Sequence, residues 1–111
     1  MSGPLVDAIG KGVDERFAEI RAYFLECCRL QGDARTELHY RAKPGDAREP
    51  TEEEIVRRWA GLVAISVADI QIGMQRAFME YAGKGWRVPS FRECVPQIQE
   101  RMAEKREGRE A

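Results

Sequence analysis

The sequence predicts an all-α fold: a single small domain of four helices, with a long irregular loop between the first two. Apolar residues recur at spacings of three and four in four separate segments, which is the period of an α-helix with one buried face. Three of these segments begin with a hydroxyl residue that is followed three positions later by a carboxylate, as helix N-termini often are. No stretch alternates apolar and polar residues for long enough to predict a strand.

The first predicted helix covers residues 13–30 and follows a glycine-rich, flexible lead-in, residues 1–12. Its apolar face is expected to consist of Val13, Phe17, Ile20, Phe24 and then Cys27 or Cys28. Its opposite, solvated face is expected to hold Glu15, Arg16, Glu19 and Glu26.

Residues 32–50 contain two prolines, two glycines and dense mixed charge, and therefore predict a long loop. The second helix is predicted over residues 51–65. Its first residue, Thr51, can accept from the backbone N–H of Glu54 while the Glu54 carboxylate reaches back, which is a capping box. The apolar face of this helix is expected to be Ile55, Trp59, Leu62 and Val63.

The third helix is predicted over residues 67–82, after a short turn in which Ser66 and Asp69 repeat the capping pattern. One face of it carries Ile70, Met74, Ala77, Phe78 and Tyr81. Ile72 and Met79, seven residues apart, form a second apolar stripe on the opposite side. Either this helix is central and buried on both sides, or Ile72 and Met79 belong to a surface that binds a partner.

Pro89 and Ser90 introduce the last helix, which is predicted over residues 90–106 with a capping box formed by Ser90 and Glu93. Its apolar face is expected to hold Phe91, Cys94, Val95, Ile98 and Met102. Pro96 leaves two alternatives, because it either bends a helix that begins at Ser90 or marks the true start of the helix. The helical domain is thus expected to span residues 13–106, followed by a disordered charged tail over residues 107–111.

The composition is that of one globular domain: 111 residues, 43% hydrophobic and 33% charged, with a net charge of −1. This charge balance predicts weak or no binding of nucleic acid. No apolar run approaches the roughly 20 residues that cross a bilayer, and no signal peptide is apparent. The three cysteines have no framework spacing and suit a reducing compartment. We therefore expect a cytoplasmic protein that does not bind membranes.

The residues that often carry chemistry are few and poorly spaced. Cys27, Cys28, Cys94 and His39 lack the spacing of a zinc site. The cysteines fall on apolar stripes, where cysteine usually acts as a small buried hydrophobe, and His39 falls in the loop. No phosphate-binding glycine pattern is present. We expect no metal, no cofactor and no enzymatic activity.

Residues 54–95 read EIVRRWAGLVAISVADIQIGMQRAFMEYAGKGWRVPSFRECV. In order, they contain an acidic helix start that leads to an arginine-flanked tryptophan, a Gly-Met pair, and an aromatic residue followed by Pro-Ser. The residues concerned are Glu54, Ile55, Arg57, Arg58, Trp59, Gly73, Met74, Trp86, Pro89 and Ser90. This order resembles the central helical segment of the replication protein P family of lambdoid phages, the helicase loaders. Where that family usually continues with Pro-Gly, this chain has Phe91-Arg92.

The resemblance implies a phage- or prophage-type DNA replication accessory protein that binds the host replicative helicase or another replisome protein. The alternative is a small helical adaptor or inhibitor that binds a different host or phage protein. Phage helicase loaders carry a further C-terminal region implicated in gripping the helicase, and this chain ends soon after Pro89-Ser90.

Partner-binding residues are predicted around the corner formed by residues 85–96, because interfaces concentrate binding energy in tryptophan, tyrosine and arginine. The candidates there are Trp86, Arg87 and Arg92, with Tyr81 one turn earlier. Further candidates are Arg57 and Arg58 beside Trp59, and Ile72 and Met79. Since proline restricts its own φ and that of the preceding residue, the corner is expected to act first as a scaffold between the last two helices.

Overall fold

The computed structural model describes residues 12–33, 37–38 and 50–108. These residues contain four helices and no strand: α2 (Gly12–Leu30), α3 (Glu52–Ala60), α4 (Val67–Gly83) and α5 (Phe91–Arg106). The predicted all-α fold is confirmed. Of the segments predicted to be irregular, residues 1–11, 34–36, 39–49 and 109–111, including His39, lie outside the described residues.

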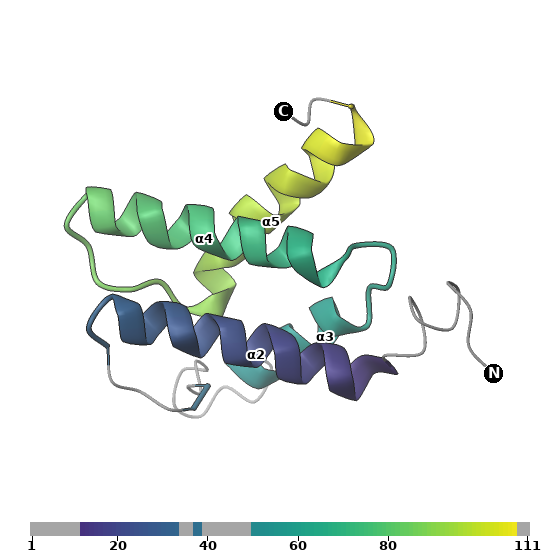
Figure 1. Cartoon of the computed structure of the whole chain (residues 1–111), viewed down its shortest axis with the longest axis horizontal. Coiled ribbons are helices and arrows are strands. Elements are labelled where there is room, and N and C mark those ends of the chain that lie inside the picture. The colour runs from purple at the N-terminus through teal and green to yellow at the C-terminus, as the bar shows by residue number, and fades with distance from the viewer. Residues whose placement is uncertain (1–11, 34–36, 39–49, 109–111) are drawn as a thin grey trace.

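Each helix packs on two others. α4 packs on both α5 and α2, and α3 packs on α2 and α5. Figure 1 shows α2 and α4 side by side, with α5 crossing α4 and its C-terminal half extending beyond the other helices. The two ends of the α4–α5 pair are therefore separate regions of the surface.

The core lies where α2, α4 and α5 meet. Phe24 of α2 contacts Phe78 of α4 and Phe91 of α5 edge to face, with 5.6 Å and 5.9 Å between ring centroids. Most of the predicted apolar positions are buried, Trp59 among them at 9% exposure. Val13, at the start of the predicted stripe of α2, is instead exposed.

Gly73 allows α4 and α5 to approach closely. A Cβ at this position would lie 2.6 Å from both Cα and Cγ1 of Ile98 and 2.8 Å from its backbone nitrogen. These distances are far shorter than the contacts of about 3.5–4.0 Å that carbon atoms prefer. Only glycine therefore fits the helix contact as it stands.

The second helix is shorter than predicted, because α3 ends at Ala60 and not at residue 65. The side chain of Arg16 donates to three carbonyl oxygens of the segment that follows: Nε to Ala60 at 2.7 Å, and Nη2 to Leu62 at 3.1 Å and Ile65 at 2.7 Å. These bonds stabilise a turn in place of a further helical turn. Leu62 and Val63, predicted on the buried face, are consequently exposed.

Arg16 itself was predicted on the solvated face of the first helix, and this is wrong, because its side chain is buried. Glu52 is also fully buried, and its Oε2 accepts from the N–H of Phe91, the first residue of α5, at 2.6 Å. Both residues lie in register with apolar positions, Arg16 four before Ile20 and Glu52 three before Ile55. Each is tolerated in the interior because it satisfies backbone groups that a helix end leaves unpaired.

The last helix begins as its capping box predicts. Ser90 and Glu93 exchange both capping bonds, and α5 starts at Phe91 and continues through Pro96. Of the two alternatives for Pro96, the structure shows the earlier start. Proline removes only one hydrogen bond, close to the N-terminus of a helix that burial of Phe91, Cys94 and Ile98 holds against the core.

Candidate functional site

The corner between α4 and α5 begins with a left-handed glycine. Gly85 has a φ of +71°. Its N–H donates to the carbonyl of Ala82 at 3.1 Å, and the N–H of Trp86 donates to the carbonyl of Tyr81 at 2.9 Å. These two bonds form a Schellman motif at the end of the helix. In this motif, the two residues joined by the longer-range hydrogen bond, here Trp86 and Tyr81, are commonly in apolar contact. The rings of Trp86 and Tyr81 accordingly lie edge to face, 5.1 Å between centroids and 85° apart.

An ion pair holds the other side of the corner. Nη1 and Nη2 of Arg87 donate to the two carboxylate oxygens of Glu93, each at 2.8 Å. The same carboxylate accepts from the N–H of Ser90 at 2.8 Å. The bonds from Arg87, followed by those from Ser90, hold the pKa of Glu93 down at about 2, because they favour the charged carboxylate. Glu93 therefore ties the turn to the start of α5.

Tyr81, Trp86, Arg87 and Glu93 line an open hollow of about 400 Å³. Trp86 is 52% exposed. The Nζ of Lys84 lies 4.5 Å from the centroid of its ring. The hollow thus combines an aromatic wall, a cation beside it and a bidentate ion pair. Its tryptophan is fixed by backbone hydrogen bonds and a ring contact, while half of its surface faces solvent.

The structure brings together three of the predicted residues, Tyr81, Trp86 and Arg87. Arg92 is exposed on the first turn of α5 and is not among the residues that line the hollow. The sequence identified Glu93 only as a helix cap. Its pairing with Arg87 has a weak sequence signal, a carboxylate six positions beyond an arginine, and the turn around Pro89 is what brings the two together.

Arg57 and Arg58 lie apart from the corner, on α3. Arg57 is tied to α2, since its guanidinium carbon lies 4.1 Å from the centroid of the Phe17 ring and its Nη1 is 3.2 Å from the carboxylate of Asp14. Arg58 is exposed. Both arginines are exposed, but Arg57 also serves the packing of α3 on α2.

The second stripe of α4 is only partly covered. Ile72 is half-buried, whereas Met79 is 66% exposed. Of the two alternatives for this helix, burial on both sides fails at Met79, which α5 and α2 leave exposed. The other alternative, a partner surface of Ile72 and Met79, stays a prediction. Ile72 and Met79 also do not line the hollow at the corner.

Most residues that carry the resemblance to helicase loaders have roles in packing or capping. Trp59 and Met74 are buried in the core, and Gly73 permits the approach of α5. The carboxylate of Glu54 accepts from the N–H of Thr51 at 2.8 Å. Trp86 differs from these residues, because it belongs to the same pattern and yet lies half in solvent.

The thiols occupy apolar surroundings. Cys28 and Cys94 are buried, Cys27 is half-buried, and none of the three forms a disulfide. Burial raises the pKa of the Cys94 thiol well above its usual value, and burial also raises that of Cys27. Both thiols therefore stay protonated at neutral pH. Across residues 12–33, 37–38 and 50–108, no group of three or more potential ligands is arranged to hold a metal ion.

Comparison with protein-family models, with curated proteins and with solved structures produced no match. The similarity to helicase loaders therefore stays a prediction from residues 54–95. No helix in the described part of the chain is both long enough and apolar enough to span a bilayer.

Proposed function

We propose that this protein acts by binding another protein through the corner hollow, without catalysis of its own. The observation that carries this proposal is Trp86, a tryptophan that is held in place and half exposed. Tryptophan is the residue type most enriched among the residues that dominate binding energy, and such residues act from the centre of a pocket or patch. A partner that covers Trp86 would bury its remaining surface.

The rigidity of the corner strengthens the proposal. Binding is weakened by the entropy of ordering side chains and loops, and a surface that is already ordered avoids this loss. At the corner, the bonds within residues 81–86 fix the tryptophan and the Arg87–Glu93 pair fixes the adjacent turn. The same bonds that make the corner a scaffold therefore also prepare it for binding.

The first partner to test is the host replicative helicase, or another replisome protein, because residues 54–95 resemble the helicase loaders of lambdoid phages. In this role the protein is a phage- or prophage-type DNA replication accessory that works in the cytoplasm. The alternative is a small helical adaptor or inhibitor of a different host or phage protein. The geometry of the corner supports protein binding, which the two roles share.

Direct binding of nucleic acid is the weaker candidate. The basic residues of the segment 55–95 are largely paired with carboxylates: Arg57 with Asp14, Arg76 with Glu104, Lys84 with Glu80 and Arg87 with Glu93. Pairing reduces the positive potential available to a phosphate backbone. This supports weak or no nucleic-acid binding.

The test is a pull-down with the purified host helicase, using wild type and two variants that each truncate an exposed apolar side chain. Trp86→Ala is expected to weaken binding at least about tenfold, as loss of a dominant tryptophan does. Met79→Ala, on the second stripe of α4, is the matched control and is expected to bind as wild type. If Met79→Ala loses binding and Trp86→Ala does not, the stripe of Ile72 and Met79 is the site.

A second arm tests the identity of the partner. Immobilised wild type and Trp86→Ala are exposed to host lysate, and captured proteins are identified by mass spectrometry. A protein other than a replisome component that is captured by wild type and lost with Trp86→Ala would favour the adaptor alternative. Equal capture by both proteins would contradict the corner as the binding surface.

A further inference from the structure

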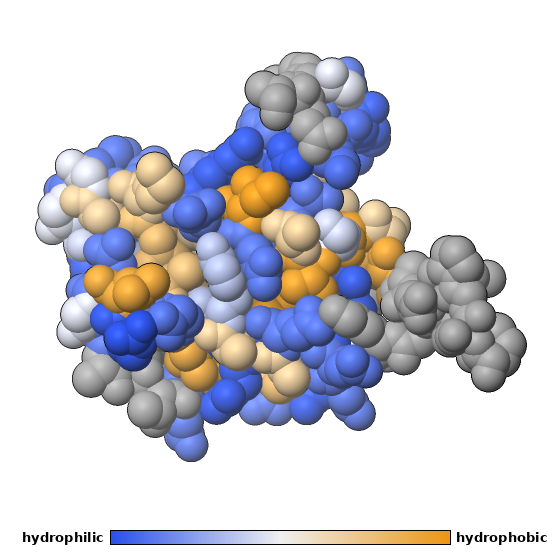
Figure 2. All heavy atoms as spheres, in the orientation of Figure 1, coloured by the Kyte–Doolittle hydropathy of each residue, from blue (hydrophilic) through white to orange (hydrophobic). Residues whose placement is uncertain are grey.

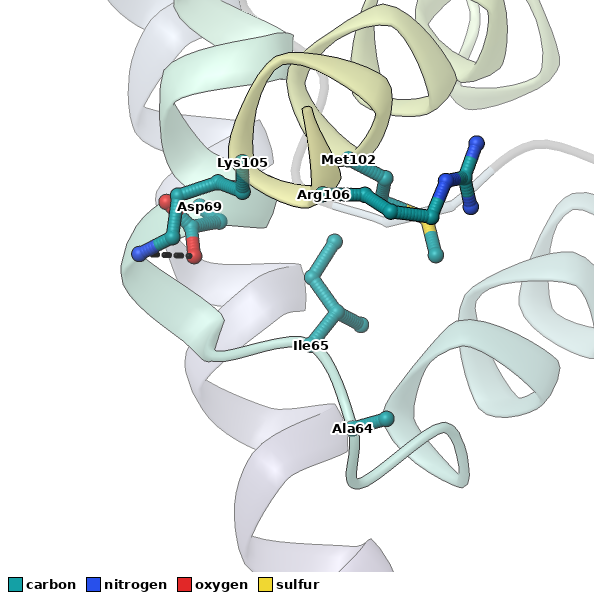
Figure 3. Close-up of a pocket in the computed structure, with 6 residues that line it drawn as sticks. All are labelled: Ala64, Ile65, Asp69, Met102, Lys105 and Arg106. Carbon is teal, nitrogen blue, oxygen red and sulfur yellow. Dashed lines mark ion pairs between the residues drawn. The ribbon is translucent and has the colours of Figure 1, made fainter. Parts of the chain in front are cut away.

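A second hollow lies at the opposite end of the α4–α5 pair, between the C-terminal turns of α5 and the turn that joins α3 to α4. Its volume is about 330 Å³, which is at the lower end of the range of ligand pockets and is large enough to receive side chains of a partner. Figure 2 shows hydrophobic atoms on this face, between the projecting end of α5 and the α3–α4 turn. The lining residues, drawn in Figure 3, are Ala64, Ile65, Asp69, Met102, Lys105 and Arg106.

The wall of this hollow and the surface beside it are apolar. Ile65 and Met102 face one another across the hollow in Figure 3. Just before it in the chain, Leu62 and Val63 are 46% and 53% exposed. The turn displays them outward because Arg16 holds the surrounding carbonyl groups from inside. Residues 62 and 63 directly precede Ala64 and Ile65, which line the hollow. We call residues 62–65 together with the hollow the turn surface.

The charged side chains that line the hollow are two cations, Lys105 and Arg106, and one carboxylate, Asp69. Asp69 is engaged from two sides, by Nε of Arg101 at 2.9 Å and by Nζ of Lys105 at 3.5 Å. Burial raises the pKa of Asp69, but the hydrogen bonds from Arg101 and Ser66 outweigh this effect and lower it. Arg106 extends past Met102, on the side of the hollow away from Asp69 (Figure 3). Arg101 and Lys105 thus pair with Asp69, and Nη1 of Arg101 also lies 3.6 Å from the carboxylate of Glu104. Arg106, on the far side of the hollow, is the cation that lies at the rim.

We propose that the turn surface docks an acidic amphipathic helix of a protein partner. An apolar side chain of that helix enters the hollow against Ile65 and Met102, its neighbours cover Leu62 and Val63, and its carboxylates lie near Lys105 and Arg106. Apolar anchors spaced along one helix face are the usual way in which such a segment occupies a groove. The basic rim favours acidic over basic helices through charge complementarity. This surface is separate from the hollow at Trp86, so a partner could engage both ends of the α4–α5 pair.

The experiment uses two synthetic helical peptides of about 15 residues, or four turns. Both carry leucine at positions i, i+4 and i+7, and one has glutamate and the other lysine at the flanking positions. Each is titrated into isotope-labelled wild-type protein while amide chemical shifts are followed by NMR. The glutamate peptide is expected to perturb residues 62–65 and 102–106. The lysine peptide is expected to bind about two- to fivefold more weakly, as the loss of a favourable exposed ion pair implies.

Variants separate the charge of the rim from the stability of the helix. Arg106→Glu is expected to weaken binding of the glutamate peptide about two- to fivefold. Arg29→Glu is the control for charge reversal, because both arginines are exposed and lie in the last turn of a helix, where they interact alike with the helix dipole. This variant also removes the ion pair between Arg29 and Glu26. The control is expected to bind as wild type. Circular dichroism verifies that both variants are folded.

Four results would overturn the proposal: equal binding of the two peptides, shift changes confined to the hollow at Trp86, no binding at about 1 mM peptide, or equal loss in both arginine variants. Two competing occupants are tested beside it. A single-stranded oligonucleotide that shifts the same residues more strongly than the glutamate peptide would assign the surface to nucleic acid. Self-association that Val63→Asp abolishes, measured by sedimentation velocity without peptide, would assign it to a second copy of the chain.

Discussion

Replacing Gly73 with alanine tests the contact on which the α4–α5 pair depends. The added methyl carbon would lie 2.6 Å from Cα and Cγ1 of Ile98 and 2.8 Å from its nitrogen. Two of these three atoms belong to the backbone of α5, so a side-chain rotation alone cannot relieve the clash. The helices would have to separate by about 1 Å to restore a normal carbon contact.

Two opposing effects decide the magnitude. Alanine is favoured over glycine inside a helix by about 1 kcal/mol. Forcing an extra methyl group into a packed core costs about 1–3 kcal/mol, and the backbone contacts at Ile98 place this site toward the upper end. We therefore expect Gly73→Ala to lower the free energy of unfolding by about 1–2 kcal/mol, and Tm by roughly 5–15 °C.

The assay is urea unfolding followed by circular dichroism, with Gly83→Ala as the matched control. Gly83 is the last residue of the same helix and does not have a positive φ. A Cβ added at this position would have no neighbouring atom within 4 Å. This control is expected to be as stable as wild type or slightly more stable. Ile98→Ala removes the Cγ1 contact but also truncates a fully buried side chain. The double variant with Gly73→Ala should therefore lose less stability than the sum of the two single variants. A Gly73→Ala variant as stable as the control would refute the steric argument.

Three further perturbations separate core, corner and turn. Trp59→Ala should lower the free energy of unfolding by about 3–5 kcal/mol in urea titrations, as truncation of a buried aromatic does. A loss below about 1 kcal/mol would argue against the burial of Trp59. Glu93, whose pKa lies near 2, stabilises the fold most above the ordinary carboxyl pKa of about 4.5, and this contribution disappears as the pH falls from about 4.5 to about 2. The stability difference between wild type and Glu93→Gln should therefore be about 1–2 kcal/mol at neutral pH, allowing for solvent screening, and shrink toward zero over that interval; a difference that does not change with pH would contradict the ion pair with Arg87. Arg16→Met keeps most of the aliphatic side chain but leaves the carbonyl groups of the α3–α4 turn without their donor. It should lower the free energy of unfolding by about 2–4 kcal/mol, and amide hydrogen exchange should rise first in residues 60–65. Unchanged exchange in these residues would show that Arg16 does not hold the turn.

The helices were predictable because their signals are local. A capping box needs only residues three apart, so Thr51 with Glu54 and Ser90 with Glu93 marked the starts of α3 and α5 correctly. Apolar spacing likewise identified the faces that meet in the core. At the corner, the sequence indicated a rigid turn and selected Tyr81, Trp86 and Arg87, which the fold brings to one hollow.

The buried charges could not be assigned from the sequence alone. Arg16 and Glu52 fall in register with apolar positions, but a charged residue at such a position is normally solvated unless a partner is available. Their partners are backbone groups 39–49 residues away in the chain, and local patterns do not indicate such distances. The early end of α3 could not be predicted for the same reason. The helix stops at Ala60, where the distant Arg16 donates to the carbonyl groups of the turn.

The local chemistry of the chain thus determined the number, starts and buried faces of the helices, since capping and amphipathic spacing act within a few residues. The tertiary structure alone decided which side chains remain at the surface. Trp86 stays half exposed because its ring packs on Tyr81 and not in the core. Arg87 is joined to Glu93, and Leu62 and Val63 face outward from a turn that Arg16 holds. Each of these outcomes depends on contacts between segments whose relative positions only the folded chain establishes.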